Sequence, residues 1–254
     1  MFWQRKMEIP GLKKILSYET IDSTNNQAKL LAQDGYPEGT LVIAEEQTKG
    51  RGRKGRSWIS LPGKSLTFSL LLRPPQNTSL ALLCALSCAW ALEEKGFYVL
   101  LRWPNDILLG DKKVGGILVE SSFSGDDLLY VIMGVGINVN ETEEDFPPSL
   151  RERATSLFLA SSCQWQRGEI LKSFLSFFFP AYFAWKEKGD FSPWVKDYEK
   201  RSSLLGKEVV VRWGKETVQG IARGIKEDGS LVLENCGGET LISWGEATLH
   251  EDQK

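Results

Sequence analysis

The residues with the clearest chemical potential form a basic, glycine-rich segment between Gln47 and Trp58. The ten positions from Gln47 to Arg56 hold five positive side chains, three glycines and no acidic residue. Like charges this dense repel one another, and glycine adds conformational freedom, so we predict a loop that becomes ordered when an anion binds. From these residues alone, two other interpretations stay open: a site for single-stranded RNA beside Trp58, and a solvated loop without a ligand.

A predicted hairpin carries a second set of reactive side chains. The segment Arg102-Trp103-Pro104-Asn105-Asp106 ends one strand, and Lys112-Lys113-Val114-Gly115-Gly116 follows a short turn. We expect this hairpin to present Asp106 and Lys113 together, and its paired glycines to let a ligand approach the backbone closely. A third segment, Gly134-Val135-Gly136-Ile137-Asn138, is a weaker signal, because it is equally typical of a bulged core strand.

The composition excludes several classes of protein. The 254 residues are 42% hydrophobic and 25% charged, which is typical of a globular protein with a sizeable core. Lysine and arginine number 31 against 33 aspartate and glutamate, so the chain has no overall basic field for nucleic acid. The single histidine, His250, stands in a polar C-terminal tail, which makes a Ser-His-Asp triad or a histidine zinc site hard to build.

The cysteines and the apolar segments predict a cytoplasmic protein that does not enter a membrane. The N-terminus lacks the apolar region of a secretion signal, and four cysteines in a chain this long do not suggest a disulfide framework. Cys84 and Cys88 are expected to be core residues rather than metal ligands. The apolar run from Leu80 to Leu92 is shorter than the ~20 residues of a membrane span. The phenylalanines at 174 and 177–179 are expected in the core, and the acidic residues at 141–145 on a solvated surface.

Taken in order, the chemistry-bearing segments resemble the catalytic core of biotin protein ligases. GRGRKGRSW is similar to the biotin and nucleotide loop of that family, and RWPND to its usual KWPND; KKVGGILVE and GVGINVN follow in the family's order. The resemblance runs from Ser23 to about Ile225, so it covers most of the chain. Arg102 replaces the family's usual lysine, which retains the charge and changes its geometry.

The resemblance implies which residues bind each substrate. Biotin contacts are implied for Ser23, Thr24, Asn25, Gln47, Arg51, Gly52, Arg53, Lys113, Gly115 and Gly116. ATP contacts are implied for Arg53, Arg56, Trp58, Asn105, Lys113 and Asn138. The side chains at 23–25 and 47 supply the donors and acceptors that a buried ureido ring requires. Trp58 and Asn138 are implied to contact the adenine and the ribose-phosphate.

The implied reaction has two steps. The biotin carboxylate attacks the α-phosphate of ATP to give biotinoyl-AMP, and a lysine amine on a carrier domain then attacks that anhydride. The first step brings two anions together, so fixed cations should stabilise it, and the candidates are Arg51, Arg53, Arg56 and Lys113. Because a lysine of pKa ~10.4 is mostly charged near pH 7, we expect Asp106 to orient the incoming amine and accept its proton. The alternative role for Asp106 is to cap the turn after Pro104. Mg²⁺ is expected on the phosphates, and the sequence does not identify its ligands.

The expected partner is the biotin carboxyl-carrier domain of a carboxylase, which could dock along an edge strand near residues 117–123. Only 22 residues precede Ser23, where the resemblance begins, so we expect no winged helix-turn-helix and no binding of operator DNA. A homodimer is left open. Two alternative functions are a lipoate-type protein ligase and a non-catalytic RNA-binding module. The complete GRGRKGR loop argues against the first, and the near-neutral net charge argues against the second.

The elements that position these residues predict an α+β fold. Strands are expected at 15–22, 40–46, 66–72, 97–103, 107–109, 117–123 and 128–139, and helices after a capping box at Thr24–Gln27 and at 79–95, 167–188 and 192–201. Short turns imply a mixed, mostly antiparallel sheet covered by helices. Strands at 208–213, 217–225, 231–234 and 240–243 predict a small β-barrel. By resemblance, the large domain (1–204) is similar to class II aminoacyl-tRNA synthetases and the small one (205–254) to SH3 domains.

Overall fold

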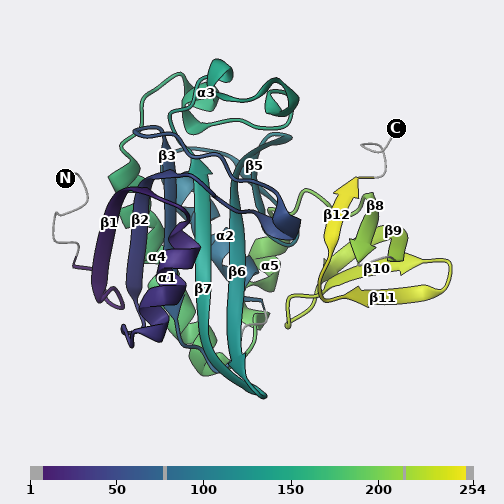
Figure 1. Cartoon of the computed structure of the whole chain (residues 1–254). Coiled ribbons are helices and arrows are strands. Elements are labelled where there is room, and N and C mark those ends of the chain that lie inside the picture. The colour runs from purple at the N-terminus through teal and green to yellow at the C-terminus, as the bar shows by residue number, and fades with distance from the viewer. Residues whose placement is uncertain (1–7, 77–78, 214–215, 250–254) are drawn as a thin grey trace.

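The computed structural model describes residues 8–76, 79–213 and 216–249 of the chain. Two units lie side by side in it, a large one built on a seven-stranded sheet and a small one built on a five-stranded sheet (Figure 1). This is the predicted α+β arrangement, with a separate β unit at the C-terminal end of the chain. His250 lies outside the described residues.

The large unit alternates strands with helices in its first half and ends in helices. Its strands are β1 (Lys14–Ile21), β2 (Thr40–Gln47), β3 (Ser65–Leu72), β4 (Val99–Arg102), β5 (Asp106–Leu109), β6 (Lys112–Ser124) and β7 (Asp127–Asn138). Its α-helices are α1 (Thr24–Gln33), α2 (Leu80–Glu93), α3 (Leu157–Ser161), α4 (Arg167–Lys188) and α5 (Val195–Glu199). Single 3₁₀ turns occur at Arg53–Gly55, Glu143–Asp145, Pro148–Leu150 and Ser192–Trp194.

The large sheet is mixed and mostly antiparallel, as the short turns predict. Its strand order is β1-β2-β3-β7-β6-β5-β4. β1 and β2 are parallel, with α1 in the connection between them, and every other neighbouring pair is antiparallel. β7 and β6 therefore stand near the middle of the sheet, next to the β5–β6 hairpin.

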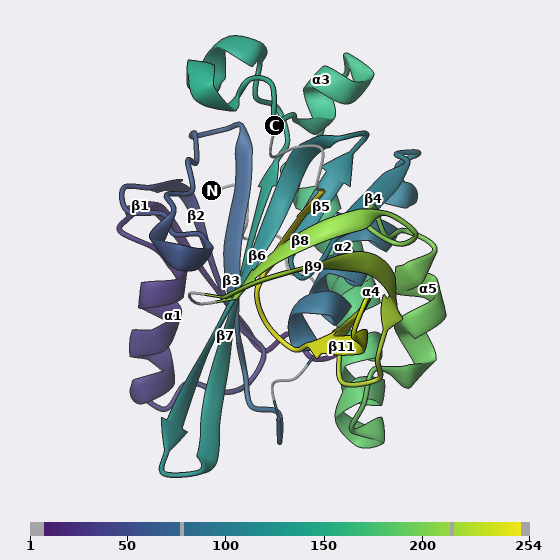
Figure 2. The same ribbon diagram turned by 90° about the vertical axis from the view of Figure 1, so that its right-hand side faces the viewer.

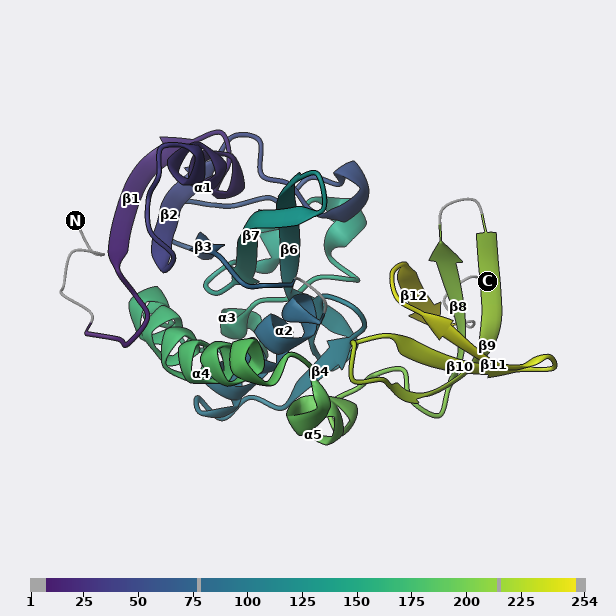
Figure 3. The ribbon, with the colours of Figure 1, turned by 90° about the horizontal axis from the view of Figure 1, so that it is seen from below.

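Helices cover both faces of the large sheet, with α1 on one side and α2 and α4 on the other (Figure 3). Leu31 of α1 packs with Val42 and Leu71, whereas Phe68 of β3 belongs to the larger core under α2 and α4. Because side chains alternate along a strand, Ser69 lies on the same face of β3 as Leu71. The face that carries α1 is therefore polar beside the first turn of that helix.

The apolar helices are core elements, as predicted. Cys84 and Cys88 of α2 are fully buried, and so are the aromatic rings of α4 at Phe174, Phe178 and Phe179. Phe174 and Phe178 stack with their ring centroids 5.4 Å apart. Among the described residues, no helix is both long enough and apolar enough to cross a membrane.

The small unit is an antiparallel sheet in the order β11-β10-β9-β8-β12, and Figure 2 shows it in front of the large sheet. Its strands are β8 (Glu208–Trp213), β9 (Glu216–Ile225), β10 (Leu231–Asn235), β11 (Gly238–Ile242) and β12 (Glu246–Leu249). The sequence prediction missed β12, because four residues that include glutamate and alanine carry little strand propensity. The domain boundary predicted at 204/205 falls in the segment between α5 and β8, and it stays a prediction.

Two local predictions are wrong. The N-cap of α1 is Ser23 rather than Thr24, and Thr24 instead gives its backbone N–H and its hydroxyl to the side-chain oxygen of Gln47. A tertiary hydrogen bond has replaced the local capping box. The acidic segment at 141–145 is not simply solvated, because Glu141 is 3% exposed and its Oε1 accepts a hydrogen bond of 2.5 Å from Ser65.

Candidate active site

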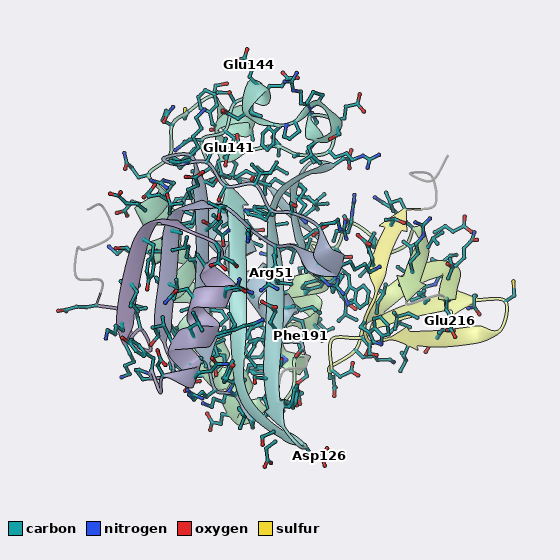
Figure 4. The ribbon with its side chains drawn as sticks, in the orientation of Figure 1. Arg51, Asp126, Glu141, Glu144, Phe191 and Glu216 are labelled. Atoms are coloured by element: carbon teal, nitrogen blue, oxygen red, sulfur yellow. The ribbon has the colours of Figure 1, made fainter. Side chains whose placement is uncertain are left out.

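A cavity of about 910 Å³ opens where the first turn of α1, the basic loop and the β5–β6 hairpin meet. Residues of β12 in the small unit also line it, so both units contribute to its wall. In Figure 4, Arg51 lies in front of β6 and β7, and Glu141 lies near the upper end of the large sheet. The cavity therefore brings together segments that are far apart in the sequence.

The predicted site residues converge on this cavity, with one exception. The predicted residues that line it, among others, are Ser23, Thr24, Asn25, Gln47, Arg51, Gly52, Arg53, Arg56, Trp58, Asn105, Asp106, Lys113, Gly116 and Asn138. Gly115 is the exception, because it is turned toward the core, where an added Cβ would lie 3.1 Å from Ile107. The contact between biotin and Gly115 stays a prediction.

The first turn of α1 forms a polar corner of the cavity. Thr24 donates its backbone N–H to Gln47 Oε1 at 2.8 Å and its hydroxyl to the same oxygen at 3.1 Å. Ser69 Oγ lies 2.7 Å from Thr24 Oγ1 and 2.6 Å from Asn25 Oδ1. Ser23, Thr24 and Asn25 are all nearly buried, and hydrogen bonds hold the side chains of Thr24 and Asn25 in place before any ligand binds.

Glycines of β6 and β7 form the floor on which larger side chains rest. A Cβ at Gly134 would lie 2.2 Å from Asn25 Oδ1, and a Cβ at Gly136 would lie 2.3 Å from the Trp58 ring. Neither position can carry a side chain without displacing those groups. The Trp58 Nε1–H is buried at this floor without a hydrogen-bond partner among the described residues.

The β5–β6 hairpin presents Asp106 and Lys113 together, as predicted. The Lys113 Nζ lies 2.5 Å from Asp106 Oδ1 and 5.9 Å from the centre of the Trp58 ring. The backbone of Lys113 is fixed as well, because its N–H donates to Arg153 O at 2.8 Å and its carbonyl accepts from Thr155 N at 2.9 Å. A carboxylate and an ammonium group thus face the cavity from one rigid hairpin.

The basic loop enters the cavity through Arg53. Arg53 Nη1 donates to Asn105 Oδ1 at 3.1 Å, and the Asn105 amide in turn donates to Ile117 O at 2.8 Å. Burial lowers the pKa of Arg53, while the charges of Glu246 and Asp106 oppose that shift. Since a guanidinium stays protonated at neutral pH, Arg53 is a half-buried cation aimed at the cavity.

The outer part of the loop is held by the small unit. Glu246 of β12 forms an ion pair with Arg56, and its other oxygen lies 3.3 Å from Lys54 Nζ. Burial would raise the pKa of Glu246, but the hydrogen bond and charge of Arg56, together with Lys54, outweigh it and lower that pKa. Glu246 is therefore ionised at neutral pH, and it connects the two units at the mouth of the cavity.

The sequence prediction missed most carboxylates of the site, and three of them make contacts or carry a perturbed pKa that matter here. Glu120 contacts Asn25 and Arg51, Glu246 contacts the basic loop, and Glu141 lines the cavity. Burial raises the pKa of Glu141, against the hydrogen bond from Ser65, and its Oε2 has no hydrogen-bond partner among the described residues. No group of three or more histidine, cysteine, aspartate or glutamate residues in the described part of the chain could hold a metal ion by itself.

Two family models match most of this chain. The model of the biotin/lipoate A/B protein ligase family matches residues 17–138, and that of the biotin protein ligase C-terminal domain matches residues 204–247. These two matches cover most of the residues that line the cavity, from the first turn of α1 to β12. They define a class of ligases that modify proteins.

Individual relatives narrow that class. The bifunctional ligase/repressor BirA of Bacillus subtilis is 37% identical over 238 residues, which are 92% of this chain and 73% of the relative. The biotin--[acetyl-CoA-carboxylase] ligase of Paracoccus denitrificans is 32% identical, over 87% of this chain and 94% of that protein. The Aquifex aeolicus biotin protein ligase, solved with biotin and ATP, superimposes with a TM-score of 0.82 at 34% identity, covering 94% of this chain and 99% of that one. The chain belongs to the biotin protein ligase family.

Proposed function

We propose that this chain joins biotin to a lysine of a biotin carboxyl-carrier domain through a biotinoyl-AMP intermediate. The observation that carries the proposal is the pair formed by Asp106 and Lys113 in the same cavity as Arg53 and the polar corner at Thr24. One cavity thus holds donors and acceptors for a neutral polar ring, cations for phosphates, and a carboxylate for an amine. The known complex of a similar protein with biotin and ATP supports the choice of substrates.

In the proposed first step, the cations stabilise the charge that develops when the biotin carboxylate attacks the α-phosphate of ATP, the bond between the α- and β-phosphates breaks and pyrophosphate leaves. Arg53 and Lys113 are the candidates for this role, because both are fixed at the cavity by hydrogen bonds to groups on β5 or beside it. Fixed cations need little reorganisation when the charge develops, and this is why they lower the barrier. Arg51 and Arg56 are proposed to contact ATP or biotin from the rim.

In the proposed second step, Asp106 receives the lysine amine of the carrier. Once Lys113 turns to the phosphate, the Asp106 carboxylate is released to accept a proton from the incoming ammonium group. The neutral amine then attacks the anhydride and AMP leaves. In this scheme, Asp106 pairs with an ammonium group in each step, first that of Lys113 and then that of the carrier.

Mg²⁺ is proposed to enter with ATP, where it neutralises charge on the phosphates. Mg²⁺ takes most of its ligands from phosphate and water and needs only one or two protein carboxylates. Of the carboxylates that line the cavity, Asp106, Asp145 and Glu246 are paired with cations. Glu141 Oε2 has no hydrogen-bond partner among the described residues, which makes its side chain one candidate ligand, beside Asp111 and Glu152, which also line the cavity.

The carrier domain is proposed to dock at the edge of β6. β5 pairs with β6 only over residues 112–116, so the rest of β6 has β7 on one side and no further strand of the described residues on the other. Such an edge accepts an extended segment of a partner. The proposals that the chain acts in the cytoplasm and does not enter a membrane rest on the sequence, which shows neither the apolar region of a secretion signal nor an apolar run of ~20 residues.

The experiment that tests the proposed function is a transfer assay. The chain is incubated with biotin, MgATP and a purified carrier domain, and the mass of the carrier is measured. The proposal expects a gain of one biotinoyl group on a single lysine, and no gain when that lysine is replaced by arginine. In a parallel incubation with lipoate in place of biotin, lipoylation of the carrier would favour the lipoate-type alternative.

A further inference from the structure

Glu120 joins three groups that belong to different parts of the site. Glu120 stands on β6. Its Oε2 accepts a 2.7 Å hydrogen bond from Asn25 Nδ2 and lies 3.1 Å from Arg51 Nη2. Its Oε1 pairs with Lys29 Nζ at 2.7 Å. Burial would raise the pKa of Glu120, but hydrogen bonds from Lys29 and Asn25 and the charges of Lys29 and Arg51 lower it. The carboxylate is therefore charged at neutral pH.

The contact with Glu120 decides which way the Asn25 amide points. Asn25 Oδ1 accepts from Ser69 Oγ at 2.6 Å, and Asn25 Nδ2 donates to Glu120. A carboxylate only accepts hydrogen bonds, so a flipped amide would place its oxygen against the oxygen of Glu120. Asn25 is 4% exposed and Gly134 lies directly beneath it, which leaves the side chain no room to move away. The second N–H of the amide is thereby fixed as a donor at the cavity.

The same carboxylate fixes the start of the basic loop. Arg51 Nη2 lies between Glu120 Oε2 and Asn26 Oδ1, which accepts from it at 2.8 Å. Asn25, Asn26 and Lys29 all stand on α1, so Glu120 ties the loop to the helix as well as to β6. The polar corner and the loop therefore share one anionic anchor.

We propose that Glu120 is a positioning residue that fixes Asn25 as a donor for biotin and couples biotin binding to the order of the basic loop through Arg51. The inference rests on the proposed role of Asn25 in binding biotin. Glu120 itself touches no substrate in this scheme. It acts by supplying an acceptor for Asn25 Nδ2 and a counter-charge for Arg51, and the loss of that acceptor would free both groups.

The test compares Glu120→Gln with Lys29→Gln as a matched control. Both substitutions break the ion pair between Glu120 and Lys29, but only the first also changes the contacts of Asn25 and Arg51. Biotin affinity is measured by calorimetry, alone and in the presence of a non-hydrolysable ATP analogue. Thermal denaturation without ligands checks that both variants fold. If Glu120→Gln does not fold, it is replaced by Glu120→Asp, which keeps the charge on a shorter side chain.

Glu120→Gln, or Glu120→Asp in its place, is expected to weaken biotin binding by about tenfold, the size of one lost hydrogen bond to a charged group, while Lys29→Gln stays near wild type. The gain in biotin affinity that the ATP analogue gives to wild type should also shrink in the Glu120 variant. Equal affinity losses in the glutamate and lysine variants, or unchanged binding in the glutamate variant, would overturn the inference. A wild type that binds no biotin would instead overturn the proposed function.

Discussion

The Lys113 Nζ lies 2.5 Å from Asp106 Oδ1, across the β5–β6 hairpin, and both groups line the cavity. The two side chains are partly exposed, so the pair can open when a stronger ligand for the ammonium group arrives. A polyphosphate is such a ligand. The pair is therefore a resting contact that holds both groups at the place where each is expected to act.

Replacing Lys113 by alanine should abolish most of the first step. A fixed charge or donor aimed at developing charge is worth about 2.7–4 kcal/mol in comparable sites, which corresponds to a 10²–10³-fold loss of rate. The measurement is the rate of biotinoyl-AMP formation in a single turnover. The adjacent Lys112→Ala is the matched control, because Lys112 is exposed and contacts only the carbonyl of Arg151 among its recorded partners. Equal rates for the two variants would remove Lys113 from the chemistry.

Asp106→Asn should affect the two steps unequally. Adenylate formation depends mainly on the cations, whereas transfer needs a group that accepts the amine proton, and an amide cannot. We expect the rate of transfer from preformed biotinoyl-AMP to the carrier to fall by at least about tenfold more than the rate of adenylation. Asp126→Asn, at the exposed turn of the β6–β7 hairpin, is the control for charge. Equal losses in both steps would assign Asp106 to ATP binding.

Arg53→Gly should release the intermediate. The substitution removes the contact with Asn105 and adds a glycine to the loop, so both effects favour the open loop. Free biotinoyl-AMP would then acylate exposed lysines of an added bystander protein, which mass spectrometry detects. Lys54→Gly is the control, because it also adds a glycine, at a residue whose φ is already 55°, and it leaves Arg53 in place. If Arg53→Gly labels the bystander no more than wild type does, the retaining role of Arg53 is wrong.

Glu246→Gln should loosen the connection between the two units in a pH-dependent way. The folded-state pKa of Glu246 lies below its ordinary value near 4.3, so its ion pairs stabilise the protein at neutral pH and are lost as the pH falls through the lowered pKa. The variant should be less stable than wild type by up to about 1 kcal/mol at pH 7, a gap that closes below about pH 4 and in high salt.

Chemical denaturation across pH measures that difference. Glu239→Gln, an exposed residue of the same small sheet, is the control and should show no pH-dependent gap. A gap between wild type and the Glu246 variant that stays constant from pH 7 to acid pH would contradict the charged contact with Arg56.

The sequence predicted the hairpin contact because its partners are seven residues apart and a short turn brings them together. It could not predict the contacts of Glu120 and Glu246, since Asn25 is 95 residues from the first and Arg56 is 190 residues from the second. Such pairs depend on strand order and on the placement of the small unit, which local patterns do not encode. The predicted capping box at Thr24 was wrong for a related reason. Thr24 donates its backbone N–H to the side chain of Gln47, 23 residues away, instead of capping its own helix.

We propose that one cavity activates biotin with ATP, and the exchange of labelled pyrophosphate into ATP tests this most directly. The exchange is measured with biotin, with lipoate and with no acid added. We expect exchange that depends on biotin and is lost in Lys113→Ala, with lipoate giving no more than the background without acid. Absence of biotin-dependent exchange in a folded wild type, or equal exchange with lipoate, would contradict the account.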